Sequence, residues 1–111
     1  MESIALKNPD KILEELNNLA DDMAEARYQY NLLDSMTKTI FSRLCLEAKK
    51  EYNCSMAEAE KHAYTRETYL THIEGLSASA KKYDSLKAKY NNYNAYIEYL
   101  RSYLSCQKHL N

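Results

Sequence analysis

The chain contains very few of the residues that interrupt helices. Its 111 residues include 1 glycine and 1 proline, and tryptophan is absent. Because tight turns depend on glycine and proline, this scarcity excludes a fold built from many β-hairpins. No stretch approaches the roughly 18 consecutive apolar residues of a membrane span, so we expect no transmembrane segment. The composition is that of a helical protein, rich in alanine, leucine, glutamate and lysine.

Cysteine and histidine are too few and too scattered to build a reactive site. The 3 cysteines are widely spaced, and the first residues lack the basic flank and apolar run of a signal peptide, so we expect a cytoplasmic protein. The 3 histidines have no metal-ligand spacing. A chain of 111 residues also has little room for an enclosed substrate cavity. We therefore predict no enzymatic activity, cofactor, metal site or small-molecule substrate.

A repeat of seven residues marks the C-terminal half of the chain. Its main positions hold Tyr69, Leu76, Tyr83, Tyr90, Ile97 and Leu104. The alternate positions hold Leu86, Tyr93 and Leu100, and His72 is expected to be a hydrogen-bonded residue of the same seam. Such a repeat predicts a long helix with a coiled-coil-like seam. A similar repeat, interrupted only by Thr37, follows the helix-start sequence Asn8-Pro9-Asp10 and predicts a first long helix.

The segment between the two repeats predicts a turn and a short helix. Asn53-Cys54-Ser55 interrupts the seven-residue repeat of the first helix, and Ser55-Met56-Ala57-Glu58 has the sequence pattern of a capping box. Thr65 is expected to cap the last helix. We predict one all-α domain over residues 1–111, with helices over about 9–52, 56–63 and 66–108. Because the connection is short, the long helices should form an antiparallel hairpin.

Apolar residues also lie outside the main seams. They are Leu32, Met36, Phe41 and Leu46 on the first helix and Tyr96, Tyr99 and Tyr103 on the last. This excess surface predicts self-association, and the alternative is a compact monomer whose first helix bends back on itself. The residues predicted to form the oligomer interface are Tyr69, Leu76, Tyr83, Tyr90, Tyr93, Ile97, Leu100 and Leu104.

Gly75 lies inside the last predicted helix, where glycine costs about 1 kcal/mol relative to alanine. Close approach of another helix would compensate for that cost. A kink at this turn, or a helix that restarts after Glu74, is an equally open explanation.

Charge is unevenly distributed along a chain whose formal net charge is −1. Residues 1–60 carry 7 Lys/Arg and 12 Asp/Glu, whereas residues 61–111 carry 8 and 4. Two interpretations remain open. The basic half could bind an anionic partner, or two helices of opposite charge could pack side by side, in one chain or in neighbouring subunits.

Cations and aromatic rings share the flanks of the last predicted helix. One flank carries Lys82, Lys89, Tyr96 and Tyr103, and the other carries Lys87 and Arg101. Single-stranded nucleic acid needs positive charge for its phosphates and aromatic rings on which its bases stack. The alternative is that the lysines pair with the acidic first helix and the tyrosines pack in a helical interface.

The middle of the chain resembles a group of small helical phage proteins. The resemblance is carried by Leu46-Glu47-Ala48-Lys49-Lys50-Glu51-Tyr52, Ser55 and Tyr69-Leu70-Thr71-His72-Ile73-Glu74-Gly75-Leu76. Within that group the chain is most similar to phage recombination mediators of the UvsY type, over about residues 30–105. The resemblance implies a ring-forming homo-oligomer of the host cytoplasm that binds single-stranded DNA and helps a recombinase displace single-strand-binding protein. It places Lys49 and Lys50 in a DNA-contacting segment, where Glu47 departs from the expected cation.

We therefore predict a homo-oligomer that binds single-stranded DNA in the manner of a phage recombination mediator, with a recombinase as a further partner. The predicted nucleic-acid-binding residues are Lys49, Lys50, Lys82, Lys87, Lys89, Tyr96, Arg101 and Tyr103. The alternative is a helical protein–protein interaction module, such as a phage assembly adaptor or an inhibitor of a host protein. In that case the tyrosine stripes contact protein and nucleic acid has no role.

Overall fold

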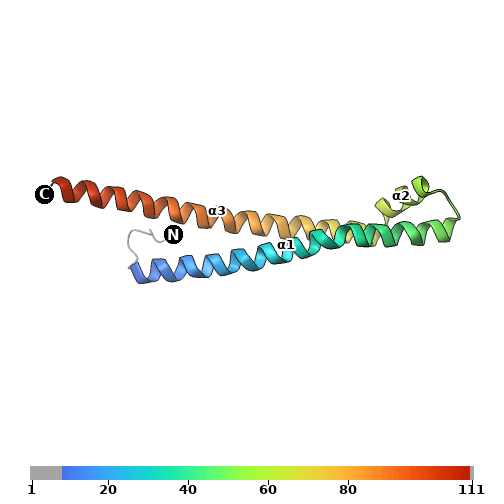
Figure 1. Ribbon diagram of the computed structural model, residues 1–111, viewed down its shortest axis with the longest axis horizontal. Coiled ribbons are helices and arrows are strands. Elements are labelled where there is room, and N and C mark those ends of the chain that lie inside the picture. Colours follow the sequence, from blue (N-terminus) through green and yellow to red (C-terminus); the bar gives the residue numbers. More distant parts are fainter. Residues whose placement is uncertain (1–8, 111) are drawn as a thin grey trace. The chain divides into compact units, whose positions relative to one another are not determined.

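The protein is a three-helix hairpin. The computed structural model describes residues 9–110, with side chains described from 10 to 109. The helices are α1 (Pro9–Tyr52), α2 (Met56–Thr65) and α3 (Glu67–Leu110) (Figure 1). No residue in this described range lies in a strand. The predicted all-α hairpin with a short connecting helix is confirmed; α2 and α3 each continue slightly beyond their predicted C-terminal ends, and Asn8 of the predicted first cap lies outside the described residues.

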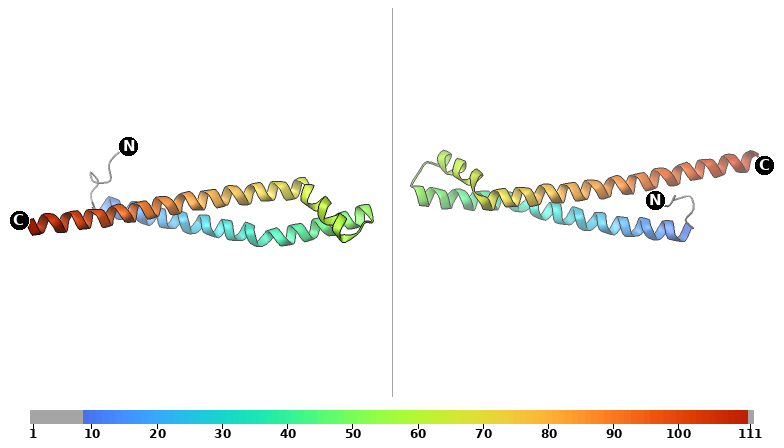
Figure 2. Two further views of the ribbon diagram at one scale, coloured as in Figure 1. Left: turned by 90° about the horizontal axis from the view of Figure 1, so that it is seen from above. Right: turned by 180° about the vertical axis from the view of Figure 1, so that it is seen from behind.

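The helices contribute to two compact units. The terminal unit comprises the described residues 9–25 of α1 and 83–110 of α3, and the central unit comprises Ala26–Lys82. In the terminal unit the two helical segments run side by side in opposite directions (Figures 1 and 2). In the central unit, the rest of α1 packs with α2 and with the first part of α3. Each unit therefore uses the antiparallel pairing that the short connection predicts.

The core of the central unit lies where its three helices meet. Leu44 and Cys45 of α1 are each 5% exposed and pack with the fully buried Ala63 of α2. Burial raises the pKa of the Cys45 thiol, and the nearby Glu60 carboxylate raises it further, so this thiol stays protonated and unreactive. The half-buried side chains that surround this cluster are Ile40, Phe41 and Tyr69.

Small side chains let α2 approach α1 closely. Ala48 of α1 and Ala59 and Ala63 of α2 are all 0% exposed. Because alanine has no side chain beyond Cβ, the two helices can approach closely at these positions, and a larger side chain would have no space there. The position of α2 thus depends on the small size of these three residues.

The ends of α2 explain where the chain turns. The Ser55 hydroxyl accepts a hydrogen bond from the Glu58 amide at 3.3 Å, which confirms the predicted cap. Asn53, just after α1, has a φ of 48°, a left-handed conformation that asparagine tolerates better than most residues. The prediction that Thr65 caps α3 is wrong. Thr65 is the last residue of α2, and its hydroxyl donates to the His62 carbonyl at 3.0 Å instead.

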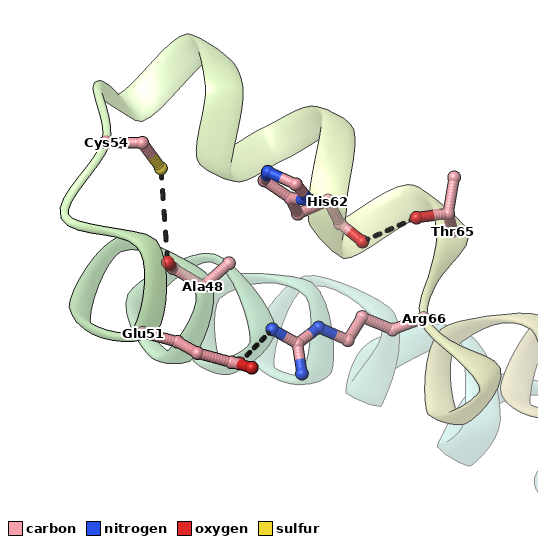
Figure 3. Close-up of polar contacts among 6 residues, drawn as sticks. All are labelled: Ala48, Glu51, Cys54, His62, Thr65 and Arg66. Carbon is pink, nitrogen blue, oxygen red and sulfur yellow. Dashed lines mark hydrogen bonds and ion pairs between the residues drawn. The ribbon is translucent and has the colours of Figure 1, made fainter.

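Several contacts join α2 and its flanking residues to the end of α1, and the polar ones are drawn in Figure 3. Arg66, which follows α2, donates to the Glu51 carboxylate at 2.6 Å, and this bond raises the pKa of its guanidinium. The Tyr52 ring stacks on His62 with centroids 4.1 Å apart, and Arg66 lies 6.0 Å from the Tyr52 centroid. The Cys54 thiol donates weakly to the Ala48 carbonyl at 3.9 Å. Exposed contacts of this kind contribute only about 0.2–1 kcal/mol each, so they orient α2 more than they stabilise it.

Two polar residues of the opposing seams meet inside the central unit. Thr37 Oγ1 lies 2.9 Å from His72 Nε2, and both side chains are half-buried. The threonine hydroxyl donates to the Leu33 carbonyl at 3.2 Å, so the histidine donates to the threonine oxygen. A polar pair in an apolar seam favours one alignment of the two helices, because any other alignment leaves both groups without this partner.

Helix α3 continues through Gly75 without interruption. A Cβ atom added at Gly75 would meet nothing within 4 Å, and the residue does not have a positive φ. Neither a close approach within this chain nor a restart of the helix therefore explains the glycine.

Replacing Gly75 by alanine is expected to raise the free energy of unfolding by about 1 kcal/mol, because alanine restricts the unfolded chain and fits the exposed helical position. Denaturant titration measures the change. Ala78→Gly, at another exposed position of α3, is the matched control and should lower stability by about the same amount. A loss of stability in Gly75→Ala would contradict this account and would indicate that another helix packs over Gly75.

Candidate nucleic-acid interface

The structure divides the predicted nucleic-acid-binding residues between the two units. Lys49, Lys50 and Lys82 belong to the central unit, and all three are exposed. The other five belong to the terminal unit, on α3: Lys87, Lys89, Tyr96, Arg101 and Tyr103. A single surface can therefore be argued only for the terminal unit.

A groove of about 620 Å³ lies between the two helical segments of the terminal unit. Lys89 and Tyr96 of α3 line it together with Glu15 and Asp22 of α1. Tyr93, also in the groove, donates its hydroxyl proton to the Glu15 carboxylate. Because two carboxylates share the groove with one lysine, its interior does not attract phosphate. Lys89 therefore shares this groove with two carboxylates of α1.

The outer side of α3 is different, since its aromatic rings face solvent. Tyr99 is 63% exposed and Tyr103 is 51% exposed. The Tyr99 ring lies 6.3 Å from that of the half-buried Tyr96, and the Tyr103 hydroxyl accepts a hydrogen bond from Gln107 at 2.9 Å. These rings have open faces of the kind on which unpaired bases stack.

The cations of this segment of α3 lie on both flanks of the helix, Lys89 on the flank of Tyr103 and Lys87 and Arg101 on the opposite flank. Lys87, Lys89 and Arg101 are all exposed. Arg101 donates to Glu98 at 3.1 Å, but both side chains are about 70% exposed, so the pair is weak and the guanidinium remains accessible to a phosphate.

Tyr99 is missing from the predicted site, although its ring is the most exposed of the aromatic rings in this segment of α3. The sequence did mark it as an apolar residue outside the seam. A tyrosine outside the seam is expected to be exposed, and this was the sequence signal that could have identified Tyr99 as a binding residue.

The residues predicted to form the oligomer interface pack largely within the chain. Seven of the eight are half-buried, and Leu104 is 64% exposed. Tyr69 packs on the core of the central unit, and Tyr93 bonds to Glu15. Ile97, Leu100 and Leu104 line a second groove of the terminal unit, of about 520 Å³, with apolar residues of α1. Their contact with another copy of the chain stays a prediction.

The charge asymmetry of the sequence has a local counterpart in the terminal unit. Residues 9–25 carry six carboxylates and one lysine, whereas residues 83–110 carry four basic and two acidic side chains. Since these two segments lie side by side, the acidic helix faces the more basic one, which is favourable at long range. The described part of the unit is nevertheless acidic in total, so one copy provides only a weak anion-binding surface.

Comparisons with known proteins identified no relative of this chain. Among the described residues no helix is both long and apolar enough to cross a membrane, and none of their His, Cys, Asp and Glu side chains form a group that could hold a metal ion. The sequence matches no protein-family model, and neither a curated protein nor a solved structure matches it.

Proposed function

We propose that this protein is a cytoplasmic homo-oligomer that binds single-stranded DNA along the exposed surface of α3 in the terminal unit. The observation that carries the proposal is the exposure of two tyrosine rings, Tyr99 and Tyr103, on the same helical segment as Lys87, Lys89 and Arg101. Rings of this kind contribute about 1–3 kcal/mol per stacked base without sequence preference, and the cations neutralise phosphate.

Poor burial in the terminal unit supports the homo-oligomer. No described residue of this unit is buried, although its seam contains leucine, isoleucine and tyrosine. A helical pair gains most of its stability by burying an apolar face, and half-buried seams leave much of that gain unused. A second copy would cover the remaining surface.

Self-association and DNA binding depend on each other in this proposal. One terminal unit is acidic in total, so its few cations bind a phosphate chain weakly. Several copies along one strand would bind it with much higher avidity, because each later contact forms at high local concentration. The same arrangement fits the role implied by the resemblance to recombination mediators, in which an oligomer presents single-stranded DNA to a recombinase.

Neutralising the terminal-unit cations is expected to weaken binding to a labelled single-stranded oligonucleotide. In Lys87→Gln/Lys89→Gln/Arg101→Gln, three phosphate contacts are lost, so the slope of log affinity against log salt should become shallower by about 2. Fluorescence anisotropy over a salt series measures both changes. The matched control, Lys38→Gln/Lys61→Gln/Lys81→Gln, removes the same charge at exposed positions of the central unit and should retain the slope.

Failure of the unaltered protein to bind the oligonucleotide at low salt would contradict the DNA-binding part of the proposal. Binding that does not depend on salt would contradict it as well, because phosphate contacts always release counterions.

A helical protein–protein interaction module is the second candidate. The observation that favours it is the groove in which Glu15 and Asp22 lie beside Tyr96, since an acidic and aromatic groove suits a protein segment better than a phosphate chain. A partner that co-purifies from host lysate and survives nuclease treatment would favour this candidate over DNA binding.

A further inference from the structure

A hollow of about 240 Å³ lies between α1 and α2 in the central unit. Six residues line it, four from α1 and two from α2: Phe41, Ser42, Cys45, Leu46, Met56 and Glu60. Leu46 and Met56 are also 63% and 44% exposed, so large apolar side chains face solvent beside the hollow. Cavities of about 150 Å³ already admit benzene, so this hollow has room for a leucine side chain.

Opposite charges flank the same hollow. Glu60 lines it from α2, near the Cys45 thiol. On α1, the exposed Lys49 follows Cys45 by four residues. The exposed Lys38 precedes Ser42 by four residues, so both lysines lie on the side of α1 that lines the hollow. None of these three charged side chains has an ion pair or a side-chain hydrogen bond with another described residue.

We propose that this hollow binds a second copy of the chain through the same surface, with α1 of each copy lying across α2 of the other. This inference rests on the self-association in the proposed function and specifies its surface. In the two-fold contact, Leu46 of each copy enters the hollow of the other. Glu60 of each copy then pairs with Lys49 of the other, so the contact contains two ion pairs at its edges.

The surface is complementary to itself, which identifies a second copy as the occupant. It provides an exposed leucine and a hollow that admits one, together with a carboxylate and a lysine that each lack a partner within the described chain. A two-fold contact uses each of these groups twice, because both copies contribute the same patch.

The lysines also determine which helices meet. Lys38 precedes the lining residues of α1 by about as much as Lys49 follows them, so an antiparallel contact between two α1 helices would bring Lys38 against Lys49. A parallel contact would bring each lysine against its own counterpart. Both arrangements are repulsive, whereas a contact of α1 with α2 gives Lys49 a carboxylate.

Two charge-reversed variants test the contact. Variant A is Glu60→Lys and variant B is Lys49→Glu. By symmetry each variant alone places like charges together twice, so its apparent dissociation constant is expected to rise by about tenfold or more. An equimolar mixture of A and B restores both attractive pairs, and its dissociation constant should return to that of the unaltered protein. Light-scattering mass over a concentration series, without oligonucleotide, measures assembly independently of DNA binding.

Rescue by the mixture is specific to a contact between copies. If Glu60 and Lys49 acted only within one chain, the mixture would remain dissociated and only the double variant Glu60→Lys/Lys49→Glu would assemble. The matched controls are Glu74→Lys and Lys81→Glu, which make the same charge changes at exposed positions of α3, seven residues apart on the side opposite its seam. Both controls should assemble as the unaltered protein does.

The possible failures of this inference and of the proposed function give different results. Assembly of A and B that equals that of the unaltered protein, or an equimolar mixture that remains dissociated, would overturn this surface and leave self-association standing. A mass of 13.0 kDa for the unaltered protein at every concentration would refute self-association and this surface together.

Circular dichroism shows whether variants A and B fold. If either loses helix content, Leu46→Ser/Met56→Ser provides the decision, because it removes the apolar side chains of the contact at exposed positions without changing charge. Dissociation of this variant supports the contact, and normal assembly overturns it.

Discussion

Replacing Leu44 by alanine is expected to lower the free energy of unfolding by about 3 kcal/mol, a large part of the total stability of a small domain. Leu44 is 5% exposed and lies in the cluster where α1, α2 and α3 meet. The deleted atoms leave a cavity against Cys45, Ala63 and Tyr69, and small neighbours such as alanine cannot fill it. Guanidinium titration followed by circular dichroism at 222 nm measures the loss.

Leu70→Ala is the matched control for this core substitution. Leu70 belongs to the same unit and is 50% exposed, so its truncation removes little buried area and should cost less than about 1 kcal/mol. Equal losses in the two variants would show that the core of the central unit does not lie around Leu44.

Replacing Ala63 by leucine is expected to displace α2 and to lower stability by about 2 kcal/mol, because a larger side chain has no space at a position that is 0% exposed. The Leu44 and Cys45 side chains pack with this residue. Since α2 is only ten residues long, it does not remain helical without its packing. Hydrogen exchange should therefore accelerate across Met56–Thr65 more than in α1 or α3.

Ala57→Leu is the corresponding control, since Ala57 lies in α2 and is exposed. It should leave exchange in α2 nearly unchanged. Protection of α2 in Ala63→Leu equal to that in Ala57→Leu would contradict close packing of α2 on α1.

Much of the fold follows from periodicity and capping alone. The seven-residue repeat from Tyr69 to Leu104 predicts α3, because a helical seam needs apolar residues at that spacing, and Ser55 predicts the start of α2 through its hydroxyl. Thr65 misled the prediction because a threonine hydroxyl can also donate backwards to a carbonyl of its own helix, as it does to His62. Local sequence does not decide between these two bonds.

Contacts between distant residues could not be predicted in the same way. Thr37 and His72 are 35 residues apart, and each is an isolated polar residue in its own repeat. Their contact depends on the alignment of two helices, which no single segment determines. For the same reason the sequence places Lys89 on a charged flank but does not show that Asp22 and Glu15 lie in the same groove.

The distribution of the candidate site over two units was also hidden in the sequence. Lys49, Lys50 and Lys82 look like parts of one basic surface when they are counted along the chain, but they belong to a different unit from Lys87 and Arg101. The exposed Tyr99 ring is the better guide, because exposure depends on packing and not on charge spacing.

Light-scattering mass, determined with and without a single-stranded oligonucleotide, tests the central claim most directly, because it measures assembly and ligand class together. The account predicts that the protein alone has a mass of at least two chains of 13.0 kDa, and that this mass increases further at low salt when the oligonucleotide is bound. A mass of 13.0 kDa that the oligonucleotide does not change would contradict the account.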